Sequence, residues 1–506
     1  MRYPDSPQLI RGLSLVAAIS VVVGNVIGTG VFLKARVMTC NVGTPGRVLG
    51  VYLVAGLLSL AGALTYAELA AMMPKSGGEY VFIREAYGRT MGFLFGWMSF
   101  FIGKAGSQAA LGVTLSLFLN IMIDGRLGGD YFSTTIWGNT VSFGSLQVVA
   151  LLSILIVTLI NCVAVRLSGI VAAILSGVKV ALVLLVGIGA FLLARGADWS
   201  HLAMVNSGGA CEGVADAARF GFGGLMAAML GALWAYDGWN NVTLVAGEVQ
   251  NPQRNLPRAL IGGTLLIMGL YLFVNLAYFY ALSPTEIANV SKASSVATEV
   301  ARTFLGPLAV SLIAAALLSS TFGTLHTSIL TGARVPYAMA RDRLFLRSLS
   351  RVSPRSHVPT GALIVQALWA CVLVIAFSSS FDTLTDYAIF GLWIFYGLVT
   401  ASVFILRRKL PDAERPYRAW GYPVVPVLFL LATALLLGST LWAVRGDAAS
   451  GTSLILQGHV LTGFKTIARN PPLAGLGLIL LGLPFYWIWS RRQTPPFEDD
   501  SPDKVS

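Results

Sequence analysis

Twelve long apolar runs follow one another along the chain, and each is long enough to cross a membrane as a helix. A transmembrane helix needs about 20 predominantly apolar residues, and Pro, Gly and clusters of charged residues separate these runs. We therefore predict an all-α, polytopic membrane protein with twelve transmembrane helices. The predicted spans lie near residues 12–39, 47–73, 87–122, 144–162, 167–195, 218–247, 258–282, 297–335, 361–379, 384–406, 424–444 and 471–490.

Composition supports this class and excludes soluble ones. Of the 506 residues, 56% are hydrophobic and 11% are charged, whereas a soluble domain has about 25% charged residues. A water-soluble enzyme, a nucleic-acid-binding domain and a disordered scaffold are therefore excluded.

No constellation of residues indicates catalysis, a metal or a cofactor. The four histidines are scattered and form no HExxH motif, and no nucleophile–base arrangement can be recognised. The cysteines form no CxxC pair, so we expect small core residues without a redox or metal role. They are Cys40, Cys162, Cys211 and Cys371. We predict that the protein is not an enzyme and needs no cofactor.

Lysine and arginine are unevenly distributed between the two sets of connecting loops. With an even number of spans both termini share a side; that side holds 22 Lys and Arg, and the opposite loops hold 11. Cytoplasmic loops carry the excess of positive charge. We predict a multi-pass protein of the cytoplasmic cell membrane with both termini in the cytoplasm. The first span has no small-residue cleavage pattern, so it is expected to be retained rather than cleaved as a signal.

Two lysines, Lys104 and Lys179, lie inside predicted spans 3 and 5. An ammonium at mid-membrane costs at least about 2.5–3.5 kcal/mol, so such a residue is functional by default and needs a partner. Snorkelling to the interface fits poorly, because each lysine has about twelve or more residues of span on both sides.

Two spans carry helix-breaking sequence at mid-membrane. Span 1 contains Gly24, Gly28 and Gly30, and each glycine weakens a helix by about 1 kcal/mol relative to alanine. Span 6 places Asp237, a glycine and two asparagines within an apolar segment. Non-helical backbone at this depth is tolerated only where it is buried in protein or lines a cavity. We predict that the helices break near Gly28 and Tyr236.

The spacing of these breaks predicts an internal repeat. They are 208 residues and five spans apart, and repeating an odd number of spans inverts the second unit. Spans 1–5 and 6–10 then form the inverted 5+5 repeat of LeuT-type transporters, whose broken helices 1 and 6 meet at a midplane site. The predicted divisions are the N-terminus 1–11, a transport core 12–406 with repeats at about 12–195 and 218–406, helices 11 and 12 with their loops at 407–490, and a disordered tail 491–506.

Broken helices offer both signs of partial charge. The N-terminal end of a half-helix presents free N–H groups to a carboxylate, and its C-terminal end presents free carbonyls to an ammonium. A site with both ends suits an α-amino acid. A glycine run alone is more often a packing surface, and Asp237 could instead hydrogen-bond backbone amides freed by the break. The pairing of the two breaks favours a site.

Several motifs resemble those of the L-type amino acid transporter family, in the amino acid–polyamine–organocation superfamily, and indicate a prokaryotic member. The resemblance covers about residues 12–440 and is most specific in span 6. The matching strings are GNVIGTGVF (24–32), YAEL (66–69), PKSGGEY (74–80), AYDGWNN (235–241), NPQRNLPRA (251–259), STFG (320–323) and ERPY (414–417).

The resemblance implies a substrate site at the two breaks. Backbone N–H groups of the first would bind the substrate carboxylate, and carbonyls of the second would bind its α-amino group. Trp234 would be an aromatic lid where the family usually has phenylalanine, which leaves side-chain size selectivity open. The implied substrate-binding residues are Ile27, Gly28, Thr29, Gly30, Trp234, Ala235 and Asp237.

The resemblance also concerns Lys104 and Lys179, the two lysines inside predicted spans. Lys179 matches a helix 5 lysine that, in sodium-independent relatives, stands where sodium-coupled members of the fold bind their ion, and Ser320 would be its partner together with helix 1 carbonyls. Lys104 resembles a basic position in helix 3 of eukaryotic members, and its role is open. Those members join a heavy chain through a cysteine between helices 3 and 4. Loop 123–143 has no cysteine, so no disulfide-linked heavy subunit is expected.

Three classes of function compete. An ion channel lacks a filter-like loop, and a membrane enzyme lacks a catalytic constellation. We therefore predict a secondary transporter that moves L-amino acids, neutral ones in particular, by sodium-independent exchange or facilitated transport. The alternative is a proton-coupled symporter in which Lys179 loses its proton during the cycle.

Overall fold

The structure, a computed structural model, describes residues 9–123, 125–136, 139–291, 294–376, 381–457 and 470–491, with single positions at 459, 462 and 466. The described chain is mostly helical and contains one antiparallel hairpin. Its elements are α1 (Leu15–Val26), α2 (Gly30–Val42), α3 (Pro45–Met72), α4 (Glu79–Tyr87), α5 (Arg89–Met98), the π-helix η1 (Ser99–Lys104), α6 (Ala105–Met122), β1 (Asp130–Ile136), β2 (Asn139–Gly144), α7 (Ser145–Val163), α8 (Val165–Leu193), η2 (Trp199–Ala203), η3 (Asp216–Ala218), α9 (Gly221–Ala235), η4 (Trp239–Glu248), α10 (Pro252–Ala281), α11 (Pro284–Asn289), α12 (Val296–Leu305), α13 (Leu308–Gly332), α14 (Arg334–Arg341), η5 (Arg347–Ser350), α15 (Thr360–Ala376), α16 (Phe381–Lys409), α17 (Val424–Ala443), α18 (Arg445–Leu456), α20 (Pro471–Leu480) and α21 (Gly482–Arg491).

Ten helical segments among the described residues are long and apolar enough to cross a membrane. The prediction of a helical, multi-pass membrane protein is confirmed. Two of the predicted spans are not among the ten. The span 218–247 is divided between α9 and the 3₁₀ helix η4, and the span 361–379 corresponds to α15, which has 17 residues. The predicted disordered tail lies, beyond Arg491, outside the described residues.

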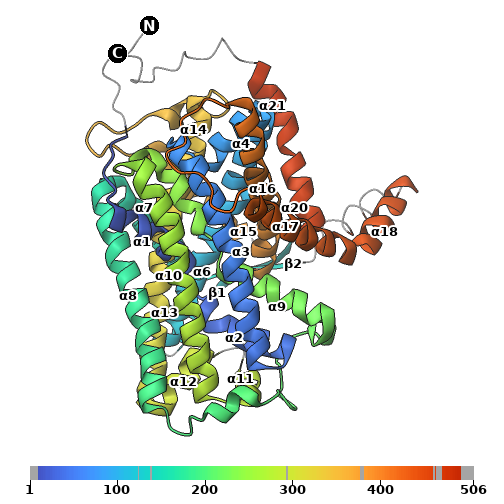
Figure 1. The fold of residues 1–506 in the computed structure, drawn as a ribbon. Coiled ribbons are helices and arrows are strands. Elements are labelled where there is room, and N and C mark those ends of the chain that lie inside the picture. The colour runs from blue at the N-terminus through green and yellow to red at the C-terminus, as the bar shows by residue number, and fades with distance from the viewer. Residues whose placement is uncertain are drawn as a thin grey trace.

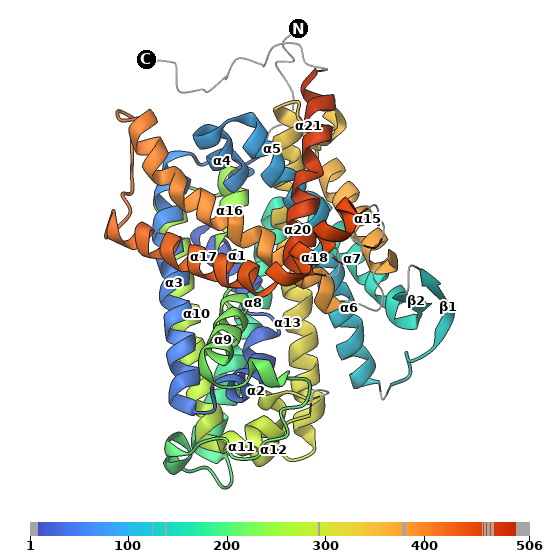
Figure 2. The same cartoon turned by 90° about the vertical axis from the view of Figure 1, so that its right-hand side faces the viewer.

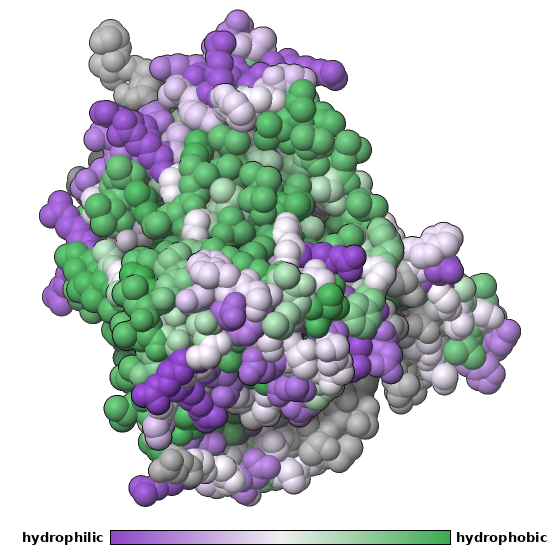
Figure 3. Space-filling model, turned by 60° about the horizontal axis from the view of Figure 1, so that its bottom comes forward, coloured by the Kyte–Doolittle hydropathy of each residue, from purple (hydrophilic) through white to green (hydrophobic). Residues whose placement is uncertain are grey.

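Large apolar side chains cover much of the outer surface. Val16, Leu192 and Leu431 are 61–74% exposed, and Figure 3 shows hydrophobic side chains gathered in a broad band on the visible face. An apolar patch of this size is rare on soluble monomers. It is the surface expected of helices that face lipid.

The two ends of the molecule carry different elements. α4 and α14 lie at one end and α11 and α12 at the other (Figure 1); we call these the α14 face and the α11 face. α21 ends at the α14 face in both views (Figure 2). The start of the described chain lies at the same face. Leu13 pairs with Val249, and the neighbouring Glu248 forms an ion pair with Arg334 at the beginning of α14. Both ends of the described chain therefore lie at one face.

A disulfide bond joins two distant segments at the α11 face. Cys40, near the end of α2, is bonded to Cys211, in the segment between α8 and α9, 171 residues away. The expectation that all four cysteines are merely small core residues is wrong for this pair, whereas Cys162 and Cys371 carry free thiols. No spacing pattern indicates this pair, because only the fold brings the two positions together.

Hydrogen bonds reinforce this junction. Arg36 of α2 donates to the backbone oxygen of Glu212 at 2.6 Å, and the N–H of Phe220, just before α9, donates to Asn41 O at 2.7 Å. The disulfide and these bonds hold α2 and the beginning of α9 together at the α11 face.

Candidate functional site

The first broken helix is interrupted at residues 27–29. α1 ends at Val26, Ile27 has a non-helical ψ of 87°, and α2 begins at Gly30. No side chain caps α2 at Thr29. The N–H of Phe32 donates to Thr29 O at 3.1 Å, which leaves the N–H groups of Gly30 and Val31 as the donors of the first turn without an intrahelical acceptor. Such a helix start attracts an anion. The N–H of Gly28, which was expected to bind the substrate carboxylate, instead donates to Val26 O at 2.8 Å.

The second broken helix turns at residues 236–238. α9 ends at Ala235, and Gly238 has a φ of +102°, a conformation that glycine adopts without strain. A Cβ atom at Gly238 would lie 3.0 Å from the Cβ of Asn25, so α1 approaches this turn closely. The carbonyls of Ala232 and Trp234 accept the N–H groups of Tyr236 and Asp237 at 3.0 and 3.1 Å. The Leu233 and Ala235 carbonyls lack intrahelical donors, which makes this end attractive to a cation.

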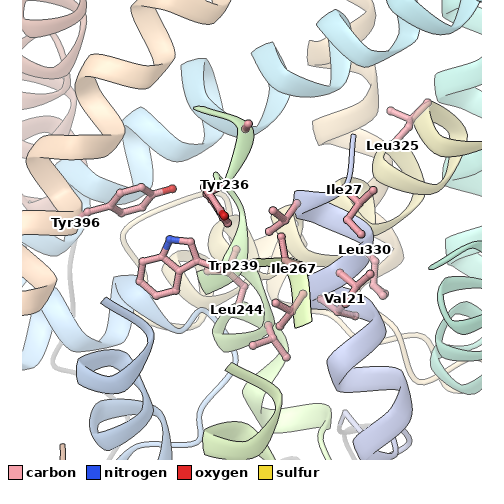
Figure 4. Close-up of a cluster of buried hydrophobic side chains, with 14 of the residues drawn as sticks. Val21, Ile27, Tyr236, Trp239, Leu244, Ile267, Leu325, Leu330 and Tyr396 are labelled. Carbon is pink, nitrogen blue, oxygen red and sulfur yellow. The ribbon is translucent and has the colours of Figure 1, made fainter. Parts of the chain in front are cut away.

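The two breaks lie against each other. A Cβ atom at Gly30 would meet the Cα of Ala235 at 3.0 Å and Cζ3 of Trp234 at 3.2 Å. Figure 4 shows Ile27 and Tyr236, one from each break, in the same group of buried apolar side chains. An N-terminal helix end and a C-terminal helix end therefore meet in one place.

The structure brings together the substrate-binding residues that the resemblance implied, although they come from segments about 200 residues apart. Four of them are partly exposed, whereas the others are buried. The partly exposed ones are Gly28, Thr29, Trp234 and Asp237. Both breaks therefore retain accessible surface where a small ligand could bind.

Lys179 holds the end of α1 from the neighbouring helix α8. Its side chain is fully buried, and Nζ donates to Gly24 O and to Oγ1 of Thr324, each at 2.7 Å. The expectation that Ser320 would be its hydroxyl partner is wrong. The Ser320 hydroxyl instead donates to Ile27 O at 3.1 Å, and the Ser320 backbone carbonyl accepts a hydrogen bond from the Thr324 hydroxyl. The two residues are one turn apart on the same face of α13, and the one nearer the ammonium is Thr324.

A polar cluster connects the second break to other helices. Lys104, the last residue of η1, donates to the side-chain oxygen of Asn241. Asn240 donates to Oε1 of Glu79 in α4 at 2.8 Å. The ammonium of Lys104 therefore has the partner that its depth requires. π-Helical turns such as η1 occur frequently at functional sites.

The carboxylate of Asp237 is held by a third helix. Tyr396 of α16 donates to its Oδ1 at 2.7 Å. This contact ties the turn of the second break to α16, while the close approach of Asn25 to Gly238 brings the same turn against α1.

Comparison with known proteins gives the family. The sequence profile described as amino acid permease matches residues 13–464, most of the chain. The chain belongs to the amino acid permease family. It is 33% identical to the serine/threonine exchanger SteT of Bacillus subtilis, over 90% of this chain and 96% of that protein. It is 31% identical to the human b(0,+)-type amino acid transporter 1, over 86% of this chain and 83% of the relative, and 31% identical to the human large neutral amino acids transporter small subunit 2, over 89% and 79%.

These similarities confirm the resemblance drawn from the motifs. The permease is a membrane-embedded amino acid transporter and not an enzyme.

Three residues that contact the two broken helices or their neighbours are not among those that the sequence singles out. Lys34, one turn beyond Gly30 in α2, places Nζ 4.7 Å from the centre of the Trp234 ring. Its position four residues after Gly30 places both residues on one face of a helix, and this spacing is the signal in the sequence that indicates the contact. The hydroxyl of Tyr271 in α10 lies 3.0 Å from Val26 O and 2.9 Å from Ala235 O. Thr324 and Tyr271 lie in continuous apolar helices, where no local pattern distinguishes them.

Ion pairs join helices of the permease at the α14 face. Arg334 and Glu248, both fully buried, form a bidentate pair with two distances of 2.7 Å. Arg407 of α16 pairs with Glu68 of α3 at 2.6 Å. A buried ion pair that loses one partner leaves an uncompensated buried charge. Separating the helices that these pairs join would therefore be costly.

A third contact at this face joins α4 to the residue after α14. Arg84 forms an ion pair with Asp342, and Tyr80 donates to the same carboxylate at 2.7 Å. Burial and the nearby Asp342 carboxylate raise the pKa of the Tyr80 phenol well above its ordinary value. Tyr80 therefore remains a hydrogen-bond donor at physiological pH.

Proposed function

We propose that this permease exchanges small neutral L-amino acids across the cell membrane without sodium. The meeting of the α2 N-terminus with the α9 C-terminus carries this proposal, because it offers an N–H end to a carboxylate and a carbonyl end to an ammonium. The chain matches SteT over 96% of the length of that protein, which is named a serine/threonine exchanger. This name supports exchange and a small neutral substrate.

Sodium independence is supported by Lys179. Its ammonium donates to a carbonyl of α1 and to a hydroxyl of α13, which are the oxygen ligands that a bound sodium ion would otherwise use. A fixed charge at this position stabilises the broken helix in place of an ion. Proton-coupled symport, the alternative, requires Lys179 to release its proton in each cycle, and the exchanger relative does not favour it.

The proposed architecture has twelve transmembrane helices, with two inverted five-helix repeats at about 12–195 and 218–406 and two further helices in 407–490. Each break interrupts the first helix of its repeat, at residues 27–29 and 236–238. This correspondence supports the repeat, since paired interruptions at equivalent positions mark the binding site of such transporters.

We further propose that the α14 face is cytoplasmic and that both termini lie on that side. The excess of Lys and Arg in the loops of this side supports it. The disulfide at the α11 face supports it independently, because disulfides persist in oxidising compartments outside the cytoplasm. The lack of a cysteine in 123–143 supports transport without a disulfide-linked heavy subunit.

Counterflow in proteoliposomes tests this function. Uptake of labelled L-serine should be stimulated about tenfold or more by L-serine or L-threonine inside the vesicles, and imposed sodium or proton gradients should not drive accumulation in empty vesicles. Protein-free liposomes are the control. Accumulation driven by a proton gradient would favour the symporter, and no stimulation by any internal amino acid would reject exchange.

A further inference from the structure

Lys34 of α2 reaches across to the indole of Trp234 in α9. The two helices lie side by side (Figures 1 and 2), and the ammonium nitrogen of Lys34 lies 4.7 Å from the centre of the Trp234 ring. An ammonium within about 6 Å of the centre of an indole is attracted by the negative face of the ring. This cation–π interaction therefore links α2, which follows the first break, to α9, which precedes the second.

The two residues lie on facing sides of their helices. Gly30 and Lys34 are four residues apart and share one face of α2, and Gly231 lies three residues before Trp234 on one face of α9. A Cβ atom at Gly30 would lie 3.2 Å from Cζ3 of the indole, and one at Gly231 would lie 3.9 Å from Cδ of Lys34. The stem of Lys34 thus crosses α9 at Gly231, and the indole lies between Gly30 and the ammonium.

The helices that carry this contact are already joined at their far ends. The disulfide between Cys40 and Cys211, with the hydrogen bonds beside it, holds α2 against the beginning of α9. These bonds limit the movement of the helices but do not reach the indole. Lys34 and Trp234 are only partly buried, so the position of the indole depends on side-chain contacts of its own, and the Lys34 ammonium supplies one of them.

We propose that Lys34 is a positioning residue for transport, which holds the Trp234 indole over the bound substrate. This inference rests on the proposed function and on the expected role of Trp234 as a lid. With the ammonium in place, the covering position of the ring is favoured and the ligand beneath it is retained. Without the ammonium, the ring covers the site for a smaller fraction of the time, which weakens substrate binding and does not hinder release.

The test is Lys34→Met in proteoliposomes. Methionine keeps an apolar stem over Gly231 but carries no charge, so this variant removes the cation and retains the packing. The KM for L-serine should rise about fivefold, which corresponds to about 1 kcal/mol, with kcat changed less than about twofold. Lys34→Gln, a second neutral variant, should behave in the same way. Lys34→Arg should restore most of the lost affinity, because a guanidinium also binds the face of an indole.

A double-mutant cycle separates this role from a general effect of the charge on the substrate. Trp234→Ala removes the ring, so adding Lys34→Met in that background should change the KM less than about twofold. Trp234→Phe keeps an aromatic face, and in that background Lys34→Met should still raise the KM. A direct effect of the ammonium on the substrate would instead persist in all three backgrounds.

Four results would overturn the role of Lys34: an unchanged KM in both neutral variants, a KM for Lys34→Arg as high as that for Lys34→Met, an undiminished effect in the Trp234→Ala background, or loss of the folded state in detergent for both neutral variants. The wild type in the same assay tests the proposed function separately. Absence of amino acid exchange there overturns both proposals, whereas normal wild-type exchange with any of the four results overturns this one alone.

Discussion

Replacing Lys179 with methionine is expected to reduce exchange about 100-fold or more. Methionine is of similar length but cannot donate the hydrogen bonds to Gly24 O and Thr324 Oγ1. Hydrogen bonds from a charged donor are worth about 1.5–3 kcal/mol each, and tenfold corresponds to about 1.4 kcal/mol. The measurement is initial-rate counterflow at equal amounts of reconstituted protein.

Lys409→Met is the matched control, because Lys409 is exposed at the end of α16 and donates to Ala86 O in α4 rather than to either broken helix. This variant should exchange at the wild-type rate. Near-normal exchange by correctly inserted Lys179→Met would contradict the assigned role of Lys179. Sodium-driven accumulation by the wild type would contradict it independently.

Replacing Trp234 with alanine is expected to lower kcat/KM at least about 30-fold. The indole lies beside Gly30 and beneath the Lys34 ammonium, at the junction of α2 and α9. It can cover a bound ligand with a large, rigid apolar surface, and its loss would leave the ligand open to water. Trp234→Phe should retain exchange and admit larger side chains, since phenylalanine occupies less volume.

Trp442→Ala is the control for this variant, because Trp442 is 68% exposed at the end of α17. Uptake kinetics should be compared at matched reconstitution, with melting temperature as a check on folding. If Trp234→Ala keeps wild-type kinetics, Trp234 is not part of the substrate site.

Local composition predicted the features of the fold that arise locally. The glycines near Gly28 and the polar string around Asp237 predicted both interruptions, because a helix cannot continue easily through such residues in an apolar environment. The same reasoning identified Lys179 as a residue that needs a partner. In each case the signal was an exception to the apolar pattern.

Features that depend on tertiary contact could not be predicted in this way. The Cys40–Cys211 bond joins positions 171 residues apart, and nothing in either segment specifies the other. The choice of Thr324 over Ser320 depends on the position of α13 along its own axis to within one helical turn, since both residues lie on the same face. Tyr271 lies among ordinary apolar helix residues, and only the arrangement of α1, α9 and α10 gives its hydroxyl two acceptors.

The most direct test of a site that binds both charged groups is competition by analogues that lack one of them. Labelled L-serine exchange should be measured against unlabelled L-serine, ethanolamine, which lacks the carboxylate, and 3-hydroxypropanoate, which lacks the amino group. Each analogue lacks the charged group that would bind at one of the two helix ends, and so loses the charged hydrogen bonds there. Both should therefore compete about 100-fold more weakly than L-serine. Competition by ethanolamine or 3-hydroxypropanoate at the strength of L-serine itself would contradict the account.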